Sequence, residues 1–265
     1  MRLVVGGSEV YAYTGSRPID AALPTVVFVH GAGNDHSVWA LQSRYFAHHG
    51  SNVLAVDLPG HGRSGGAALP SIAAIAGWIA AVLDALEIGS AALVGHSMGS
   101  LAVLECAARH ADRVARIALV GAAFPMPVSD ALLAAARADD HVAFELITVW
   151  SHSAGRSLGG NAVPGLWMTG STLRLLERTK PGVLYTDLAA CHAYAGGTDA
   201  ATKVHCPALL IVGARDIMAP PRSASGLAAA MPDARVVTLR DCGHALMAEA
   251  PDAVLDALRG FLGRS

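Results

Sequence analysis

The stretch Val94-Gly95-His96-Ser97-Met98-Gly99 places a serine between two glycines. An apolar run, residues 91–94, precedes it, and a helix-forming run, residues 100–110, follows it. A strand, a sharp turn and a helix are therefore predicted here, with Ser97 in the turn. Because the glycines let the strand and the helix pass closely, we expect Ser97 to sit on a strained backbone with its hydroxyl exposed.

The turn lies within a regular alternation of apolar strands and helices. Strands are predicted at residues 25–29, 52–57, 91–94, 114–120, 208–213 and 235–239, with two short ones within residues 2–13. Helices are predicted within residues 35–50 and at residues 71–86, 98–110, 220–231 and 251–262. Continuous apolar strands joined by helices are typical of a mostly parallel sheet with helices on both faces. The sequence therefore predicts an α/β fold.

Residues 122–204 interrupt this alternation. They contain no strongly apolar strand, but they contain helical stretches at residues 139–152 and 171–194, with a second helix starting at Pro181. A chain of 265 residues commonly forms one core with an inserted segment. We therefore expect a core formed by residues 1–121 and 205–265, and a helical insertion formed by residues 122–204.

The composition narrows the class of partner. Hydrophobic residues make up 53% of the chain and charged residues 15%, which excludes a disordered protein. The formal net charge is -2, and no Lys/Arg cluster offers an electrostatic footprint for nucleic acid or an anionic membrane surface. A small molecule is therefore the expected partner. The sequence does not indicate whether the protein is a monomer or an oligomer.

The apolar segments and the cysteines indicate a soluble, cytoplasmic protein. The apolar run in residues 1–10 is too brief for a secretory signal, and the run 72–83 falls short of the roughly 18–20 residues that span a bilayer. No C-x-x-C and no metal-like spacing links the cysteines, so free thiols are favoured over disulfides. The cysteines are Cys106, Cys191, Cys206 and Cys242.

Three residues suited to nucleophilic chemistry follow predicted strands, in the order Ser97, Asp216 and His244. In an open parallel sheet, ligands bind at the carboxyl ends of the strands. A serine hydroxyl is a poor nucleophile at neutral pH, so it needs a histidine to take its proton and a carboxylate to orient the imidazole. We therefore expect these three side chains to meet in one site.

Five motifs together resemble the α/β-hydrolase fold family across nearly the whole chain. They are His30-Gly31-Ala32-Gly33, Asp57-Leu58-Pro59-Gly60-His61-Gly62-Arg63-Ser64, Gly95-His96-Ser97-Met98-Gly99, Gly213-Ala214-Arg215-Asp216 and Gly243-His244. The resemblance implies an eight-stranded, mostly parallel sheet. It also implies a helical cap inserted after strand six, which matches residues 122–204.

The roles that the resemblance implies agree with the chemistry of the residues. Ser97 is the expected nucleophile, His244 the base and Asp216 the carboxylate that orients it. The backbone N–H groups of Ala32 and Met98 are expected to form the oxyanion hole. The function expected is that of a serine hydrolase, resembling a carboxylesterase, that cleaves a carboxylic ester or a related acyl compound through an acyl-enzyme without a cofactor.

Other acidic residues and histidines compete for these roles. Asp57 also follows a strand, but the Gly-rich loop after it favours a structural role in a turn. We expect His30 to order its own loop and His96 to pack inside the serine turn. Asp35 and His36 suggest metal ligands, yet neither H-E-x-x-H nor another ligand spacing supports them, so no metal site is predicted.

The substrate pocket is the part that the sequence specifies least. Its candidate residues are aromatic or apolar and lie in the insertion or near the site loops: Trp39, Phe124, Phe144, Trp150, Trp167, Met218 and Leu246. Their character favours a small or medium uncharged acyl group, although the insertion's residues could equally form its own core. A substrate with a free carboxylate would call for an arginine facing the site, and Arg137, Arg156, Arg174 and Arg178 are the candidates.

Two alternatives stay open on this sequence. The same three residues serve carbon–carbon bond hydrolysis, enol-lactone opening or acyl transfer in proteins of this fold. A ligand-binding module without turnover is the other alternative. Ser97 stands where haloalkane dehalogenases and epoxide hydrolases have an aspartate, which disfavours those two activities.

Overall fold

The computed structural model describes residues 1–157 and 165–263. Its eight strands form one sheet in the order β1-β2-β4-β3-β5-β6-β7-β8. β1 pairs antiparallel with β2, β2 pairs antiparallel with β4, and every other neighbouring pair is parallel. The strands are β1 (Arg2–Val5), β2 (Ser8–Tyr13), β3 (Thr25–Val29), β4 (Asn52–Val56), β5 (Ala91–His96), β6 (Val114–Val120), β7 (Ala208–Gly213) and β8 (Ala234–Leu239). The predicted fold class is confirmed.

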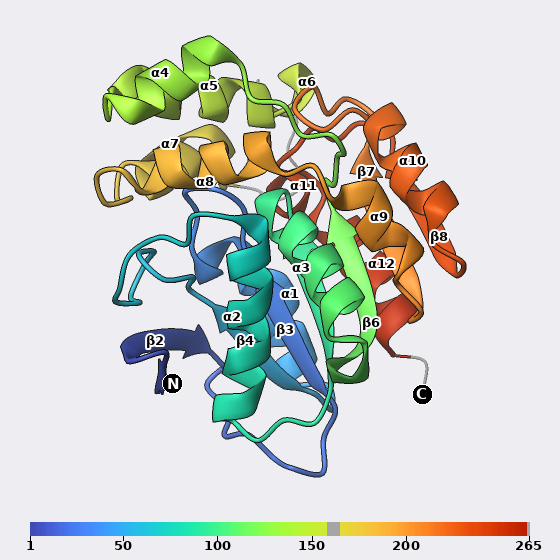
Figure 1. Ribbon diagram of the computed structural model, residues 1–265. Coiled ribbons are helices and arrows are strands. Elements are labelled where there is room, and N and C mark those ends of the chain that lie inside the picture. The colour runs from blue at the N-terminus through green and yellow to red at the C-terminus, as the bar shows by residue number, and fades with distance from the viewer. Residues whose placement is uncertain (158–164, 264–265) are drawn as a thin grey trace.

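Helices cover both faces of the sheet (Figure 1). One face packs against α2 (Ile72–Ala85), α3 (Met98–Arg109), α9 (Gly197–Thr202) and α10 (Pro221–Ala230). The other packs against α1 (Ala40–Ala47), α11 (Leu246–Glu249) and α12 (Pro251–Leu262). Every residue of β3 and β4 is buried, as expected for strands covered on both sides. A short 3₁₀ turn at His36–Trp39 precedes α1, and another at Ala111–Arg113 precedes β6.

The predicted helix start at Ser71 illustrates how local sequence sets these elements. The Ser71 side chain accepts a hydrogen bond from the N–H of Ala74, which caps the first turn of α2. At the far end of the chain, Pro251 occupies the first turn of α12, where its missing N–H costs nothing. The buried side chains of α12 then lie on one face, against the sheet.

A second layer of helices lies above the sheet, on the side to which β6 points (Figure 1). Its members are α4 (Asp130–Arg137), α5 (His141–Ser151), α7 (Met168–Leu176) and α8 (Val183–Ala193), which we call the cap helices. The short α6 (Ala154–Ser157) follows α5. The cap helices share a small apolar core that includes Leu132, Ile147 and Leu188.

The sequence located these cap helices only coarsely. It missed α4, and it extended the helix now seen as α7 into the turn before α8, where Gly182 adopts a φ of +77°. α9 lies inside the expected insertion 122–204, yet it packs on α3 and α10 beside the sheet. Residues 158–164 of that insertion lie outside the described residues. The boundaries of the cap therefore stay a prediction.

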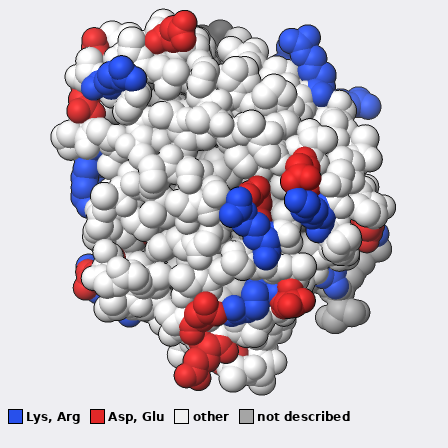
Figure 2. All heavy atoms as spheres, in the orientation of Figure 1, with Lys and Arg blue, Asp and Glu red and all other residues white. Residues whose placement is uncertain are grey.

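Charged side chains are dispersed over the face shown in Figure 2, and several Lys and Arg residues lie beside an Asp or Glu. This face therefore carries no extended basic patch. Among the described residues, no helix is both long enough and apolar enough to cross a membrane. All four cysteines are free thiols.

Candidate active site

The serine turn has the strained geometry that its glycines predict. Ser97 adopts a φ of +53° and a ψ of −118° between β5 and α3, a backbone conformation that non-glycine residues rarely occupy. A Cβ added to Gly95 would lie 2.2 Å from the carbonyl oxygen of Gly99, and one added to Gly99 would lie 2.5 Å from that of Val29. Glycine is therefore required at both positions, because backbone occupies the space.

His244 and Asp216 form a buried hydrogen-bonded pair. The His244 Nδ1 lies 2.7 Å from the Asp216 Oδ2, and each residue is 4% exposed. The Asp216 Oδ1 accepts bonds from the N–H groups of Met218, at 2.9 Å, and Ala219, at 2.7 Å. Burial acts to raise the pKa of Asp216, but the charge and hydrogen bond of His244 and these N–H groups lower it below its ordinary value. An ionised Asp216 keeps the proton on Nδ1 of His244, so Nε2 is left as a proton acceptor.

Ser97 and His244 line one cavity of about 970 Å³, which lies between the sheet and the cap helices. Ala32 lines it too. This volume is at the upper end of the range common for small-molecule sites, roughly 300–1,000 Å³. The nucleophile candidate and the base candidate therefore face a shared space large enough for a substrate.

His96 supports the loop that carries His244. Its Nε2 donates to the backbone oxygen of His244 at 2.9 Å, and its buried Nδ1 has no partner within the described part of the chain. Burial, together with the nearby His244, lowers the pKa of His96 to about 3. His96 is therefore neutral, and its side chain is packed inside the turn.

The loop 31–34 borders the serine turn. A Cβ added to Gly31 would lie 3.2 Å from the Ser97 Cβ, so the loop backbone is pressed against the turn. Met98 begins α3 directly after Ser97, and the N–H groups of a first helical turn have no partner within the helix. Met98 thus follows Ser97 directly, and Ala32 follows the glycine that is pressed against Ser97. Their assignment as oxyanion donors stays a prediction that this placement supports.

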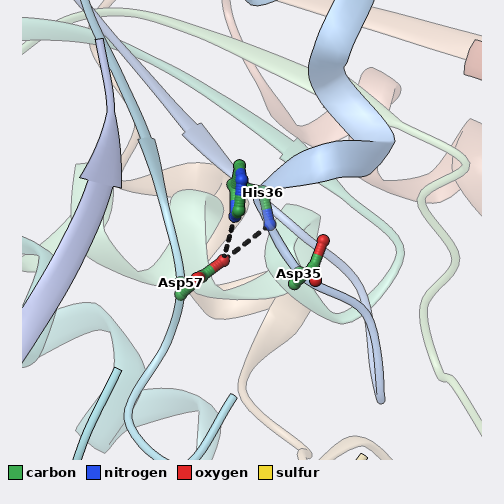
Figure 3. Close-up of side chains that lie close together, drawn as sticks. All are labelled: Asp35, His36 and Asp57. Carbon is green, nitrogen blue, oxygen red and sulfur yellow. Dashed lines mark hydrogen bonds and ion pairs between the residues drawn. The ribbon is translucent and has the colours of Figure 1, made fainter. Parts of the chain in front are cut away.

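Asp35, His36 and Asp57 can each offer one ligand atom, all within 4.8 Å of one another (Figure 3). The side-chain oxygens of the two aspartates, however, already accept hydrogen bonds from the two loops that follow β3 and β4. The Asp57 Oδ1 accepts from both the N–H and the Nδ1 of His36 at 2.7 Å, and its Oδ2 accepts from the N–H of Arg63. The Asp35 Oδ1 accepts from the backbone of Ser37. We therefore assign this cluster a role in fixing two loops rather than in binding a metal.

A protein-family model described as "Alpha/beta hydrolase family" matches residues 26–257. The chain belongs to this family. It is 33% identical over 263 residues to a pimeloyl-[acyl-carrier protein] methyl ester esterase of Aromatoleum aromaticum, covering 89% of this chain and 99% of the relative. It is 25% identical to an (E)-2-((N-methylformamido)methylene)succinate hydrolase of Acinetobacter baylyi, covering 89% of each.

Solved structures give the same picture of the alpha/beta hydrolase fold. The chain superposes on the enol-lactonase from Burkholderia xenovorans LB400 with a TM-score of 0.88 and 27% identity, covering all of both chains. An esterase from Exiguobacterium antarcticum, at 18% identity and a TM-score of 0.86, shares the fold. The expected family and fold are thus confirmed over the full length.

Two of the seven candidate pocket residues of this alpha/beta hydrolase line the cavity: Trp150 of α5 and Met218, which follows β7. Trp39 and Leu246 are fully buried in the core beside the sheet, where Trp39 packs on Phe28. These two large side chains fill the sheet's own packing layer, so they lie under the site rather than in the cavity.

The other three candidates also lie elsewhere. Phe124 packs edge-on against Tyr194, and Phe144 packs within the core of the cap helices. Trp167 is 68% exposed. The cap helices instead present residues that the sequence did not single out, because the inward face of each helix is set by its packing. They include Leu132, Ile147, Met168, Leu175 and Leu188.

Two of the four candidate arginines, Arg174 of α7 and Arg178 after it, line the cavity. They are 70% and 69% exposed, which places them at its mouth. No Asp or Glu is found among the described lining residues. Arg137 instead binds the hydroxyl of Tyr185, and Arg156 contacts the backbone of Asp241. Arg174 pairs with Glu177, and Arg178 lies 3.8 Å from Asp35. The cavity therefore has a mostly apolar interior and a rim that carries two exposed arginines, each paired with a carboxylate.

Proposed function

We propose that this alpha/beta hydrolase is a serine hydrolase that cleaves a carboxylic ester through an acyl-enzyme on Ser97. One observation carries the proposal: His244, which is paired with Asp216, and Ser97 of the strained turn line the same cavity. The strained turn exposes a nucleophile, and the pair supplies a base whose tautomer is fixed. The similarity to esterases supports the same reaction.

In the first half of the reaction, the Ser97 Oγ attacks the ester carbonyl carbon and His244 Nε2 takes the hydroxyl proton. The carbonyl π electrons move to the oxygen, and the N–H groups of Ala32 and Met98 stabilise that oxyanion. When the oxyanion collapses, the bond to the alcohol oxygen breaks. His244 returns the proton to the leaving alcohol, which leaves the acyl group on Ser97.

In the second half, His244 takes a proton from water, and the resulting hydroxide attacks the acyl carbon. Collapse of the second oxyanion breaks the bond to Ser97 Oγ, which recovers the proton from His244. The net reaction consumes one ester and one water and yields one acid and one alcohol. Asp216 stays ionised throughout, since its part is to hold and stabilise the imidazolium.

The cavity suggests the kind of ester. Its apolar cap residues favour an aliphatic acyl chain of medium length. Two relatives, 33% and 35% identical, are methyl ester esterases, which supports a small alcohol group. The exposed arginines at the mouth favour substrates that carry an anionic group at the end distant from the ester.

A second candidate is lactone hydrolysis, which the likeness to the enol-lactonase favours. It uses the same steps, except that the alcohol and the acid remain in one molecule. In either case the reaction requires no cofactor. The four free cysteines support a reducing compartment such as the cytoplasm.

The test is hydrolysis of p-nitrophenyl esters of rising acyl length, with an enol-lactone alongside, by the wild type and by Ser97→Ala. We expect the variant to lose about 10⁴-fold or more in turnover. A fluorophosphonate should label the wild type on the peptide that contains Ser97. If no ester or lactone is turned over, or if Ser97→Ala retains the activity, the proposal fails.

A further inference from the structure

A buried contact joins a cap helix to the loop 31–34. Asp187 of α8 is 1% exposed, and His61, in the loop after β4, is 3% exposed. The Asp187 Oδ2 accepts from the backbone N–H of Gly33 at 2.9 Å and lies 2.8 Å from the His61 Nε2. One carboxylate oxygen of the cap therefore binds two separate loops of the core.

The surroundings of His61 define its protonation state. Its Nε2 faces the Asp187 carboxylate, and its Nδ1 lies 3.0 Å from the backbone oxygen of Pro59. Both neighbours are acceptors, so both ring nitrogens must carry a proton for both contacts to be attractive. Burial acts to lower the pKa of His61, but Asp187, the Pro59 carbonyl and Asp57 raise it above its ordinary value. The ring is then an imidazolium.

The neighbouring histidine, His30, has the opposite role. Its Nδ1 bonds to the Gly31 oxygen at 2.8 Å, and its Nε2 accepts from the N–H of Leu58 at 3.1 Å. This arrangement satisfies a neutral ring, and burial together with the nearby His61 lowers the pKa of His30 to about 4. His61 thus packs beside a neutral ring, and Asp187 and Asp57 are the carboxylates that favour its protonated form.

These contacts fix the two peptide groups on either side of Ala32. The Gly31 carbonyl and the Ala32 N–H belong to one trans peptide group, so the bond from His30 to that carbonyl turns the N–H to the opposite side. The next peptide group contains the Gly33 N–H, which Asp187 holds. Thr179 also donates to the Gly33 oxygen at 2.8 Å. The direction of the Ala32 N–H therefore depends on the core through His30 and on the cap through Asp187.

We propose that Asp187 and His61 form an ion pair through which the cap positions the loop 31–34, and with it the Ala32 N–H, for the reaction. Asp187 and His61 are positioning residues, because they act on the reacting atoms only through the loop. The inference rests on the proposed function for its consequence on turnover, but the ion pair itself is independent of that function.

The pH dependence follows from the sign of the shift. The pKa of folded His61 is raised above the ordinary 6.5. The ion pair thus contributes its full stability below about pH 6.5 and loses it as the pH rises through the folded pKa. A neutral His61 ring has one nitrogen without a proton, so a lone pair faces either the Asp187 carboxylate or the Pro59 oxygen. The contact between Asp187 and the two core loops then weakens. Wild-type kcat should fall on this alkaline limb, and His61→Gln should lack the limb.

Three variants test the positioning role at neutral pH. Asp187→Asn keeps the shape but removes the charge, and a misplaced donor lowers turnover by about 10-fold to 100-fold. We expect this loss in kcat, with KM within about threefold of wild type. His61→Gln should show a similar loss, and the double variant should lose no more than either single one, since the two act through each other.

The matched control is Lys180→Met. Lys180 also joins the cap to the core, but its Nζ donates at 3.2 Å to the Ser64 oxygen instead of to the loop 31–34. Its kcat should stay within about twofold of wild type. An equal loss of kcat in Lys180→Met would mean that removing any contact between cap and core lowers turnover, and it would overturn the proposal. So would an Asp187→Asn variant that retains kcat or changes only KM.

The ion pair is tested without a substrate by ¹⁵N NMR of protein labelled at the histidine rings, with His61→Gln to assign the signals. At pH 6, below the ordinary pKa of 6.5, both ring nitrogens of His61 should be protonated in the wild type, and one should lose its proton in Asp187→Asn. A neutral His61 in the wild type overturns the proposal. Failure of the proposed function would appear separately, as a wild type that turns over no ester, and the NMR result would still decide the ion pair.

Discussion

The two walls of the cavity are built in different ways. The core wall, which holds Ser97 and His244, is fixed by backbone contacts: Gly95 against Gly99, and Gly99 against β3. The wall formed by the cap helices is made of apolar side chains, such as Ile147 and Leu188, that also pack on one another. Where an added Cβ would lie 2–3 Å from backbone atoms, only glycine fits, whereas an apolar face tolerates many side chains. The core wall is thus constrained for chemistry, and the cap wall can vary with the substrate.

The largest change in activity from the core wall should come from Asp216→Asn. An amide in place of the carboxylate points an N–H₂ group at the His244 Nδ1 or loses its bond there. His244 then favours the tautomer with a proton on Nε2, which cannot accept the Ser97 proton. We expect a loss of about 10⁴-fold in kcat for an activated ester. Steady-state kinetics measure it, with circular dichroism to verify the fold.

A near wild-type rate for Asp216→Asn would show that another acid orients His244. Asp57 is the alternative acid that follows a strand, but its carboxylate accepts hydrogen bonds from His36 and from the backbone N–H of Arg63 instead. Asp57→Asn should therefore reduce stability, while leaving the tautomer of His244 unchanged.

The backbone constraint in the core wall is tested by Gly99→Ala. The new Cβ would lie 2.5 Å from the Val29 oxygen and 2.6 Å from the His30 oxygen, so strand and helix must separate. We expect destabilisation of about 3 kcal/mol, measured by urea unfolding. Gly77→Ala in α2 is the matched control, because nothing lies within 4 Å of its added Cβ. It should gain up to about 1 kcal/mol.

The same difference between the walls explains how much the sequence could predict. Sharp turns require glycines, and buried strands require apolar runs, so the sheet, the Ser97 turn and the Asp216 and His244 positions could be inferred from residues alone. The pairing of His244 with Asp216 joins strands β7 and β8, whose order in the sheet follows from the fold.

The cavity lining could not be inferred in the same way. Trp39 and Trp150 are both large aromatic residues near site segments, yet one fills the core and the other faces the cavity. Which face a helix turns inward depends on its tertiary packing, and the pattern of α8 gives no clear apolar face. Asp187 escaped notice for a related reason. A single acid in a helix shows no motif, and its partners lie 126 and 154 residues away.

The cap wall should affect selectivity more than rate. Trp150→Ala removes a ring that lines the cavity, so longer acyl chains should gain relative to shorter ones. Burial of a methylene is worth about 0.8 kcal/mol, which corresponds to roughly fourfold in kcat/KM per added methylene that the new space accommodates. Phe144→Ala, on the same helix but packed within the cap core, should leave the ratio of long to short esters unchanged. A shift in both variants would mean that the cap is deformed as a whole.

The smallest effect should come from the charged rim. Arg178 is 69% exposed and lies 3.8 Å from Asp35, so solvent screens much of its charge. An exposed ion pair contributes at most about 1 kcal/mol, and Arg178→Gln should lower kcat/KM for an ester with a terminal carboxylate by about fivefold or less. The neutral methyl-capped analogue should be unaffected, and 1 M salt should abolish the difference. Arg137→Gln, whose arginine binds Tyr185 away from the lining, is the control. If it lowers turnover of the charged ester equally, the net charge of the cap steers the substrate and the rim does not bind it.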